Sequence, residues 1–129
     1  MAYAYKDDFT ALANACKNGG YSSGNFSPTE IKTSIEAVTS KGVYWITNYE
    51  SGDNKTGLVF HDGTNKLFFP AAGRSYSDSR SDGGDSGYYW SSTWNSSSVA
   101  YDLFFGSSDV YPQDIYLRYY GFSVRPVSD

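Results

Sequence analysis

The sequence contains GLVFHDGTNKLFF at residues 57–69, two short apolar runs separated by a polar turn. Residues 57–61 and 66–69 are rich in the β-branched and aromatic residues that favour strands. Asp62 and Gly63 between them form a dipeptide that strongly indicates a tight β-hairpin turn. The stretch therefore predicts two antiparallel strands, and Pro70 and the small residues after it end the hairpin.

Strand patterns continue on both sides of this hairpin. VYWIT at residues 43–47 and YYWSS at residues 88–92 are each typical of a strand. Residues 74–87 consist mainly of Ser, Asp and Gly, which predicts a surface loop. The apolar positions that we expect to face inward on a following strand are Ala100, Leu103 and Phe105, and those on the last strand are Phe122, Val124 and Val127.

Helical patterns occur only in the first third of the chain. Phe9, Leu12, Ala13 and Cys16 are spaced to form one apolar stripe, which predicts a helix over residues 7–18 that Gly19-Gly20 ends.

A second helix is predicted over residues 28–40. Ser27-Pro28-Thr29-Glu30 matches a capping box with proline at the first helical position. Ile31, Ile35 and Val38 would form its buried stripe, and Lys41-Gly42 would end it. Together these elements predict an α+β fold in a single domain over residues 1–129.

Composition excludes several classes of protein. Ten Lys and Arg against 14 Asp and Glu give a net charge of −4, so no basic surplus is present for a partner bound through phosphates, and we expect no nucleic acid. One His and one Cys exclude a structural zinc site and a disulfide framework. No apolar run is long enough to span a membrane, and the first residues lack a signal-peptide core, so we expect no membrane insertion.

No catalytic or metal-binding pattern is recognisable, and we expect a domain without cofactor, metal or enzymatic activity. His61 has no evident partner for acid–base work, and Cys16 lies on the apolar stripe of the first helix. Asp78, Asp82 and Asp85 are spaced unlike a calcium loop, although a Ca²⁺ ion in this loop stays open. Paired carboxylates brought together from distant positions also stay open.

Aromatic residues are concentrated near the C-terminal end. Residues 88–122 contain 12 aromatic residues in 35, more than one sheet face can bury. The last Lys is Lys66 and the last Glu is Glu50, so the surface beyond them must be built from Ser, Asp, Tyr, Asn, Gly and Arg. Residues 111–120 follow neither the strand nor the helix period, which favours loops that contact a partner over a filled core.

Three motifs in this region resemble the C-terminal signature of a known family. YYWSST at 88–93, AYDLFF at 100–105 and GFSVRPV at 121–127 resemble the Fibrobacter-type major paralogous domain of gut Bacteroidetes and their phages. TGLVF at 56–60 and FPAAG at 69–73 resemble the preceding hairpin of that family, so the resemblance covers residues 56–127. It implies a C-type lectin-like fold of the formylglycine-generating-enzyme type, with two helices, a twisted, mainly antiparallel sheet and long irregular loops. The paired cysteines of those enzymes are missing, so their oxidation chemistry is not implied.

The family includes variable proteins of diversity-generating retroelements, in which selected codons near the C-terminus are rewritten. The resemblance implies a variable region at residues 88–127. The resemblance implies that such codons never yield Lys, Glu, Gln, Met or Trp. Residues 95–120 contain no Lys, Glu, Met or Trp, and their one Gln is Gln113. The positions predicted to vary and to bind ligand are Ser97, Ser98, Val99, Asp102, Phe104, Tyr111, Asp114, Ile115, Tyr116, Leu117, Tyr119 and Tyr120.

The resulting hypothesis is a non-enzymatic domain that recognises a receptor or surface ligand, in phage tropism or in cell-surface adhesion. Its partner would be a protein or a glycan, at the surface of a phage virion or a bacterial cell, and the oligomeric state stays open. One alternative is an adhesion or structural domain of the same fold without diversification. Another alternative is an enzyme that acts on carbohydrate.

Overall fold

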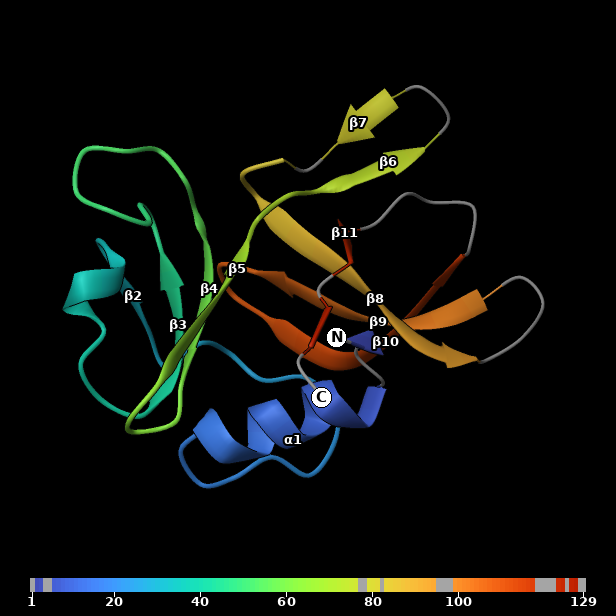
Figure 1. Cartoon of the computed structure of the whole chain (residues 1–129), viewed down its shortest axis with the longest axis horizontal. Helices are drawn as coiled ribbons and strands as arrows, with labels where there is room; N and C mark the ends of the chain where they lie inside the picture. The colour runs from blue at the N-terminus through green and yellow to red at the C-terminus, as the bar shows by residue number, and fades with distance from the viewer. Residues whose placement is uncertain are drawn as a thin grey trace.

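Two four-stranded sheets and one α-helix make up most of the structure (Figure 1). The computed structural model describes residues 2–3, 6–76, 79–81, 83–94, 99–117, 123–124 and 126–127. The elements are β1 (Ala2–Tyr3), α1 (Lys6–Cys16), β2 (Glu30–Lys32), the 3₁₀ turn η1 (Ile35–Ala37), β3 (Gly42–Ile46), β4 (Gly57–His61), β5 (Lys66–Pro70), β6 (Arg74–Tyr76), β7 (Ser79–Ser81), β8 (Ser86–Trp94), β9 (Val99–Gly106), β10 (Val110–Leu117), β11 (Ser123–Val124) and β12 (Pro126–Val127).

The strand order is β2-β3-β4-β5 in the first sheet and β10-β9-β8-β11 in the second sheet. Pairing is antiparallel except between β2 and β3 and between β8 and β11, which are parallel. The short strands β1 and β12 pair with each other and bring the two ends of the chain side by side (Figure 1). The described fold is thus α+β, mostly sheet, and no helix in the described residues has the length and apolar character needed to cross a membrane.

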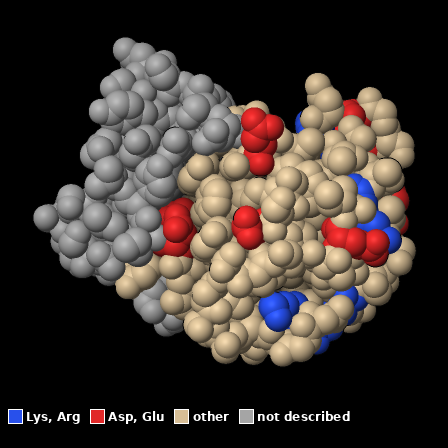
Figure 2. Space-filling view, turned by 180° about the vertical axis from the view of Figure 1, so that it is seen from behind, with Lys and Arg blue, Asp and Glu red and all other residues tan. Residues whose placement is uncertain are grey.

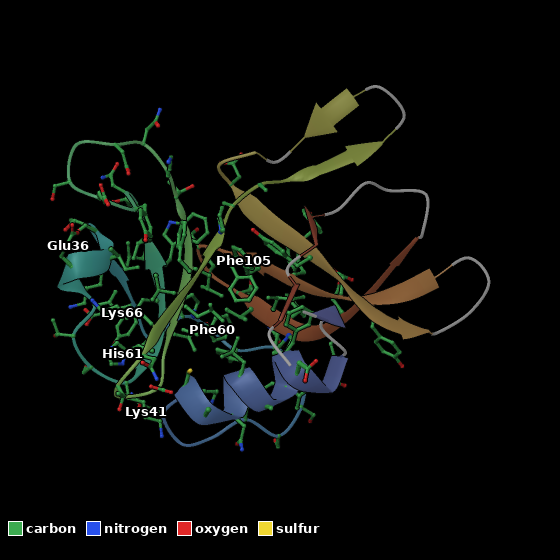
Figure 3. All side chains as sticks on the ribbon, in the orientation of Figure 1. Glu36, Lys41, Phe60, His61, Lys66 and Phe105 are labelled. Atoms are coloured by element: carbon green, nitrogen blue, oxygen red, sulfur yellow. The ribbon has the colours of Figure 1, made fainter. Side chains whose placement is uncertain are left out.

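The main core lies between the two sheets and α1. Phe9, Ala13 and Cys16 of α1 are buried there, as the apolar stripe of the sequence predicts. Figure 3 shows Phe60 of the first sheet and Phe105 of the second in this central space. The remaining buried members include Trp45, Leu58 and Phe69 from the first sheet and Tyr89, Leu103 and Val110 from the second. The predicted helix over residues 7–18 and the inward positions Leu103 and Phe105 are therefore confirmed.

A smaller core covers the other face of the first sheet. Val38, Tyr44, Ile46 and Val59 are buried there, and side chains from η1 and the loops around it pack over them. Every residue of β3 and of β4 is consequently buried, because both faces of these strands are covered. This double burial explains why the sequence of the two strands is apolar up to His61, with no alternation between apolar and polar residues. The hairpin predicted over residues 57–69 is confirmed as β4 and β5.

The helix predicted over residues 28–40 is wrong. Glu30–Lys32 form strand β2, which pairs in parallel with Tyr44–Ile46, and only Ile35–Ala37 turn as a short 3₁₀ segment. Thr29 secures the start of this pairing: its backbone N–H donates to the Val43 carbonyl at 2.6 Å, and its hydroxyl accepts the Val43 N–H at 3.1 Å. Ile31, predicted to be buried, is 59% exposed, whereas Val38 is buried. β-branched residues weaken the helix locally, and the backbone bonds gained at the edge of β3 favour the strand.

The first testable consequence concerns Ser27, which is exposed and precedes no helix. Replacing Ser27 with alanine is expected to change the free energy of unfolding by about 0.5 kcal/mol or less, as for an ordinary surface position. Urea unfolding of the two proteins measures this difference. A loss of about 1 kcal/mol or more is the cost of removing a helix cap and would contradict the strand assignment.

Two further predictions for the C-terminal half need correction. Part of the predicted surface loop at residues 74–87 forms the β6–β7 hairpin, which projects from the body of the molecule in Figure 1. The predicted irregular segment is strand β10 as far as Leu117, with a register shift between Tyr111 and Asp114. Pro112 lies in this bulge and is buried, while the Gln113 amide donates to the Thr10 hydroxyl of α1. A bulge adds residues on one strand, so the strict period of two is lost although the chain remains extended.

Candidate functional site

The second sheet carries a row of aromatic rings on the face that points away from the main core. Tyr88, Phe104 and Tyr111 are register neighbours on β8, β9 and β10. Their ring centroids lie 4.8 Å apart for Tyr88 and Phe104 and 5.5 Å apart for Phe104 and Tyr111. We call these three residues the aromatic strip. The opposite face of the second sheet belongs to the main core. Its residues Tyr89, Leu103, Phe105 and Val110 alternate along the strands with those of the aromatic strip.

The rings of the aromatic strip differ in exposure. Tyr88 is buried, whereas Phe104 and Tyr111 are half-buried and keep part of their surface in contact with solvent. Tyr88 therefore supports the Phe104 ring, and the two others can touch a partner. The sequence pattern predicts a strand at Tyr88 but does not indicate that its ring belongs to the site. Tyr88 lies opposite Phe104 only because of how β8 pairs with β9, and no local sequence pattern shows this pairing.

Two aspartates lie beside the aromatic strip on the same strands. Asp102 on β9 is the register partner of Asp114 on β10. Asp102 is fully buried, and its carboxyl group interacts with that of Asp114. Burial first, then the charge of Asp114 and a hydrogen bond with its side chain, raise the pKa of Asp102 to about 9. Asp102 is therefore protonated at neutral pH, and the half-buried Asp114 is the residue of this pair that reaches solvent.

The structure brings together four of the twelve predicted ligand-binding residues: Asp102, Phe104, Tyr111 and Asp114. For Asp102 the prediction of ligand binding needs correction, because its carboxyl group is fully buried and cannot touch a partner in this conformation. Val99, Ile115, Tyr116 and Leu117 lie on β9 and β10, where the register pairs Leu117 with Val99 and Tyr116 with Ala100. Ser97, Ser98, Tyr119 and Tyr120 lie outside the described residues.

Charged residues are scarce around the aromatic strip. Strands β8, β9 and β10 contain two aspartates, Asp102 and Asp114, and no Lys, Arg, Glu or His. On the face shown in Figure 2, the Lys and Arg atoms lie over the right and lower parts of the molecule. Among the described side chains of these three strands, a partner that meets the strip would therefore contact aromatic rings, hydroxyl groups and the carboxylate of Asp114.

His61 and Cys16, the two candidate catalytic residues, are both buried, and their contacts serve the structure of the protein. The Nδ1 atom of His61 accepts the Gly63 N–H at 2.9 Å, which fixes the β4–β5 turn. Burial, with a smaller effect of Asp62, raises the pKa of the Cys16 thiol to about 11, so the thiol stays protonated at neutral pH. Of the three aspartates considered for calcium, Asp85 is exposed, and Asp78 and Asp82 lie outside the described residues.

Comparison with known proteins gives one family match. A family model described as "Domain of unknown function (DUF8237)" matches residues 28–127. No curated protein and no solved structure matches the chain. The matched range contains both sheets of the fold and the whole aromatic strip.

Proposed function

The chain belongs to the family described as domain of unknown function DUF8237, and we propose that it is a non-enzymatic domain that binds a receptor or surface ligand through the aromatic strip. The observation that carries this proposal is the half-exposed pair of rings, Phe104 and Tyr111, held 5.5 Å apart by adjacent strands. Large rings fixed by a sheet offer contact area at a low cost in conformational entropy, which is why aromatic residues dominate binding hot spots.

The finer part of the proposal is a C-type lectin-like fold whose residues 88–127 are diversified by a retroelement. Eight of the twelve predicted variable residues lie on the paired strands β9 and β10. Of the four whose side chains the structure describes, Phe104, Tyr111 and Asp114 keep part of their surface in contact with solvent, and Asp102 is buried. Leu103, Phe105 and Val110 on the same strands are fully buried and would have to stay constant. This separation of core and surface positions is what a variable binding face requires.

The partner that this surface favours is a protein on a bacterial cell, and the proposed setting is phage tropism or cell-surface adhesion. Aromatic rings with little charge around them suit the apolar centre of a protein interface. A glycan at the same surface is the alternative partner. An adhesion domain without diversification is the alternative function, and the neighbouring DNA distinguishes it: diversification requires a reverse transcriptase gene and a near-copy of the segment that encodes residues 88–127.

Binding to intact cells tests the proposal directly. The fluorescently labelled protein is expected to bind a subset of a panel of gut Bacteroides strains in flow cytometry. Replacing Phe104 and Tyr111 together with serine should reduce this binding about tenfold or more, because it removes both exposed rings.

The matched control is Ile31→Ser, which removes the large apolar side chain that is exposed on β2 of the other sheet. This variant should bind the same strains as the unchanged protein. If the unchanged protein binds no strain, or if the double variant binds as well as the control while its circular dichroism is unaltered, the aromatic strip is not the binding surface.

A further inference from the structure

A second candidate site lies at the C-terminal end of α1, in the segment that connects the helix to β2. The structure contains a cavity there with a volume of about 390 Å³, lined by Asn14, Lys17, Gly19, Gly20, Tyr21, Ser22, Ser23 and Asn25. This volume is within the range of sites that bind small molecules. None of these residues belongs to the aromatic strip.

Hydrogen bonds within the segment hold the walls of the cavity in place. The Asn14 side-chain oxygen accepts the Tyr21 backbone N–H at 3.1 Å, and the Lys17 ammonium donates to the Gly20 carbonyl at 3.0 Å. Gly19 and Gly20 both have positive φ angles, 84° and 76°, which let the chain turn sharply after the helix. Further along, Phe26 exchanges backbone hydrogen bonds with Val110 and so ties the segment to β10.

Tyr21 forms the aromatic part of the cavity wall. Its hydroxyl donates to the Gly24 carbonyl at 2.9 Å, and its ring lies 5.7 Å from the Phe26 ring. Because both ends of the side chain are held, the ring keeps its orientation without a ligand. A fixed aromatic ring can pack against the C–H groups of a flat, partly apolar ring.

The other side chains of the lining offer polar groups. In the described structure no hydrogen-bond partner is found for the Asn14 side-chain nitrogen or for the hydroxyls of Ser22 and Ser23. Asn25 uses its nitrogen to contact Asp109, which leaves its oxygen as an acceptor. The cavity thus presents both donors and acceptors, and its lining includes no aliphatic side chain and no carboxylate.

Charge narrows the class of ligand further. A cationic ligand is disfavoured because the one charged side chain of the lining is Lys17. An anionic ligand is disfavoured because the cavity adjoins the C-terminal end of α1, where the helix dipole is negative. In addition, the Lys17 ammonium already donates a hydrogen bond to the Gly20 carbonyl. The absence of aliphatic side chains from the lining excludes an apolar ligand. The ligand class that remains is neutral and polar, such as a molecule with many hydroxyl groups.

We propose that this cavity, formed by the end of α1 and residues 17–25, binds a neutral saccharide unit, with the pyranose ring against Tyr21 and its hydroxyls on Asn14, Ser22 and Ser23. The site is separate from the aromatic strip and does not depend on the function proposed for it. A partner that carries glycans would then contact the protein at two places.

Protein NMR titrations with free sugars test this site. The probes are glucose, galactose and N-acetylglucosamine, together with glucuronic acid and glucosamine as charged counterparts of glucose. At least one neutral sugar is expected to shift the amide signals of residues 14–25 saturably, with a Kd on the order of 1 mM. The charged counterparts should bind more weakly than the neutral sugars.

Two variants assign the binding to the cavity. Asn14→Asp keeps the oxygen that accepts the Tyr21 N–H but removes the amide donor, and it should weaken binding about tenfold. Asn18→Asp is the matched control: Asn18 is exposed beside the cavity but is not part of its lining, and this variant should bind as the unchanged protein does. Tyr21→Ala should abolish binding, whereas Tyr21→Phe should retain most of it.

The proposal is overturned if no neutral sugar gives a saturable shift, or if Asn14→Asp binds as well as Asn18→Asp. Tighter binding of glucuronic acid than of glucose would identify an anion site and would also overturn it. Each of these results is independent of cell binding through Phe104 and Tyr111, so the two proposals can fail separately.

Discussion

Replacing Asp102 with asparagine is expected to raise the free energy of unfolding at pH 7 by about 2–4 kcal/mol. Asp102 is fully buried, and its pKa is raised from 3.8 to about 9, mainly by burial and further by the neighbouring Asp114. In the folded protein the carboxyl group therefore holds a proton at pH 7, whereas in the unfolded chain it is ionised. Folding must take up this proton, and asparagine, which is neutral in both states, avoids that cost.

The same substitution is expected to change how stability depends on pH. Because the folded-state pKa lies above the unfolded-state value, the stabilising effect of the proton is complete below about pH 4 and is lost as the pH rises to about 9. The advantage of Asp102→Asn over the unchanged protein should grow across this range and become constant above it. Urea unfolding at a series of pH values measures both curves.

The exposed residue Asp85 provides the control for this experiment. The free energy of unfolding of Asp85→Asn should differ little from that of the unchanged protein at every pH. An Asp102→Asn variant that is less stable than the unchanged protein at pH 7 would show that the carboxylate is ionised and bound by a partner group. That result would contradict the protonated state inferred from its burial.

The second large effect is expected where Gly87 on β8 faces Phe105 on β9. A Cβ atom at Gly87 would overlap the ring of Phe105, so Gly87→Ala should cost about 1–3 kcal/mol of stability through overpacking. Phe105 is fully buried and packs against Trp45 and Tyr89, so Phe105→Ala should cost about 3–5 kcal/mol. The double variant should cost less than the sum by about 1 kcal/mol or more, because the ring that obstructs the new methyl group is gone.

Denaturant unfolding of the four proteins measures this coupling. Gly83→Ala is the matched control, since a Cβ atom there meets no atom within 4 Å, and its effect should add to that of Phe105→Ala without coupling. If Gly87→Ala costs the same with and without the Phe105 ring, the two residues are not in contact. The packing between β8 and β9, on which the position of the aromatic strip depends, would then be wrong.

Local patterns in the sequence correctly predict the elements whose stabilising contacts lie close together along the chain. The stripe Phe9, Ala13 and Cys16 marks the buried side of α1, and Gly19 and Gly20 end the helix with positive φ angles. Asp62 and Gly63 mark the hairpin turn, where the Asp62 side chain accepts the N–H groups of Thr64 and Asn65 and Gly63 takes a φ of 106°. Each of these features involves neighbours a few residues apart, so the sequence pattern carries the necessary information.

Contacts between distant segments decide the remaining features. Residues 28–40 carry a helix-start pattern, yet pairing of Glu30–Lys32 with β3 outweighs it, and the bulge at Pro112 and Gln113 conceals a strand from period counting. For the aromatic strip, composition predicts exposed aromatic rings, but the register of β8, β9 and β10 determines that Tyr88, Phe104 and Tyr111 form one row. The burial of Asp102 is likewise absent from any local pattern. Which strand pairs with which, and what covers a sheet face, depends on backbone bonds and packing between residues far apart in the chain.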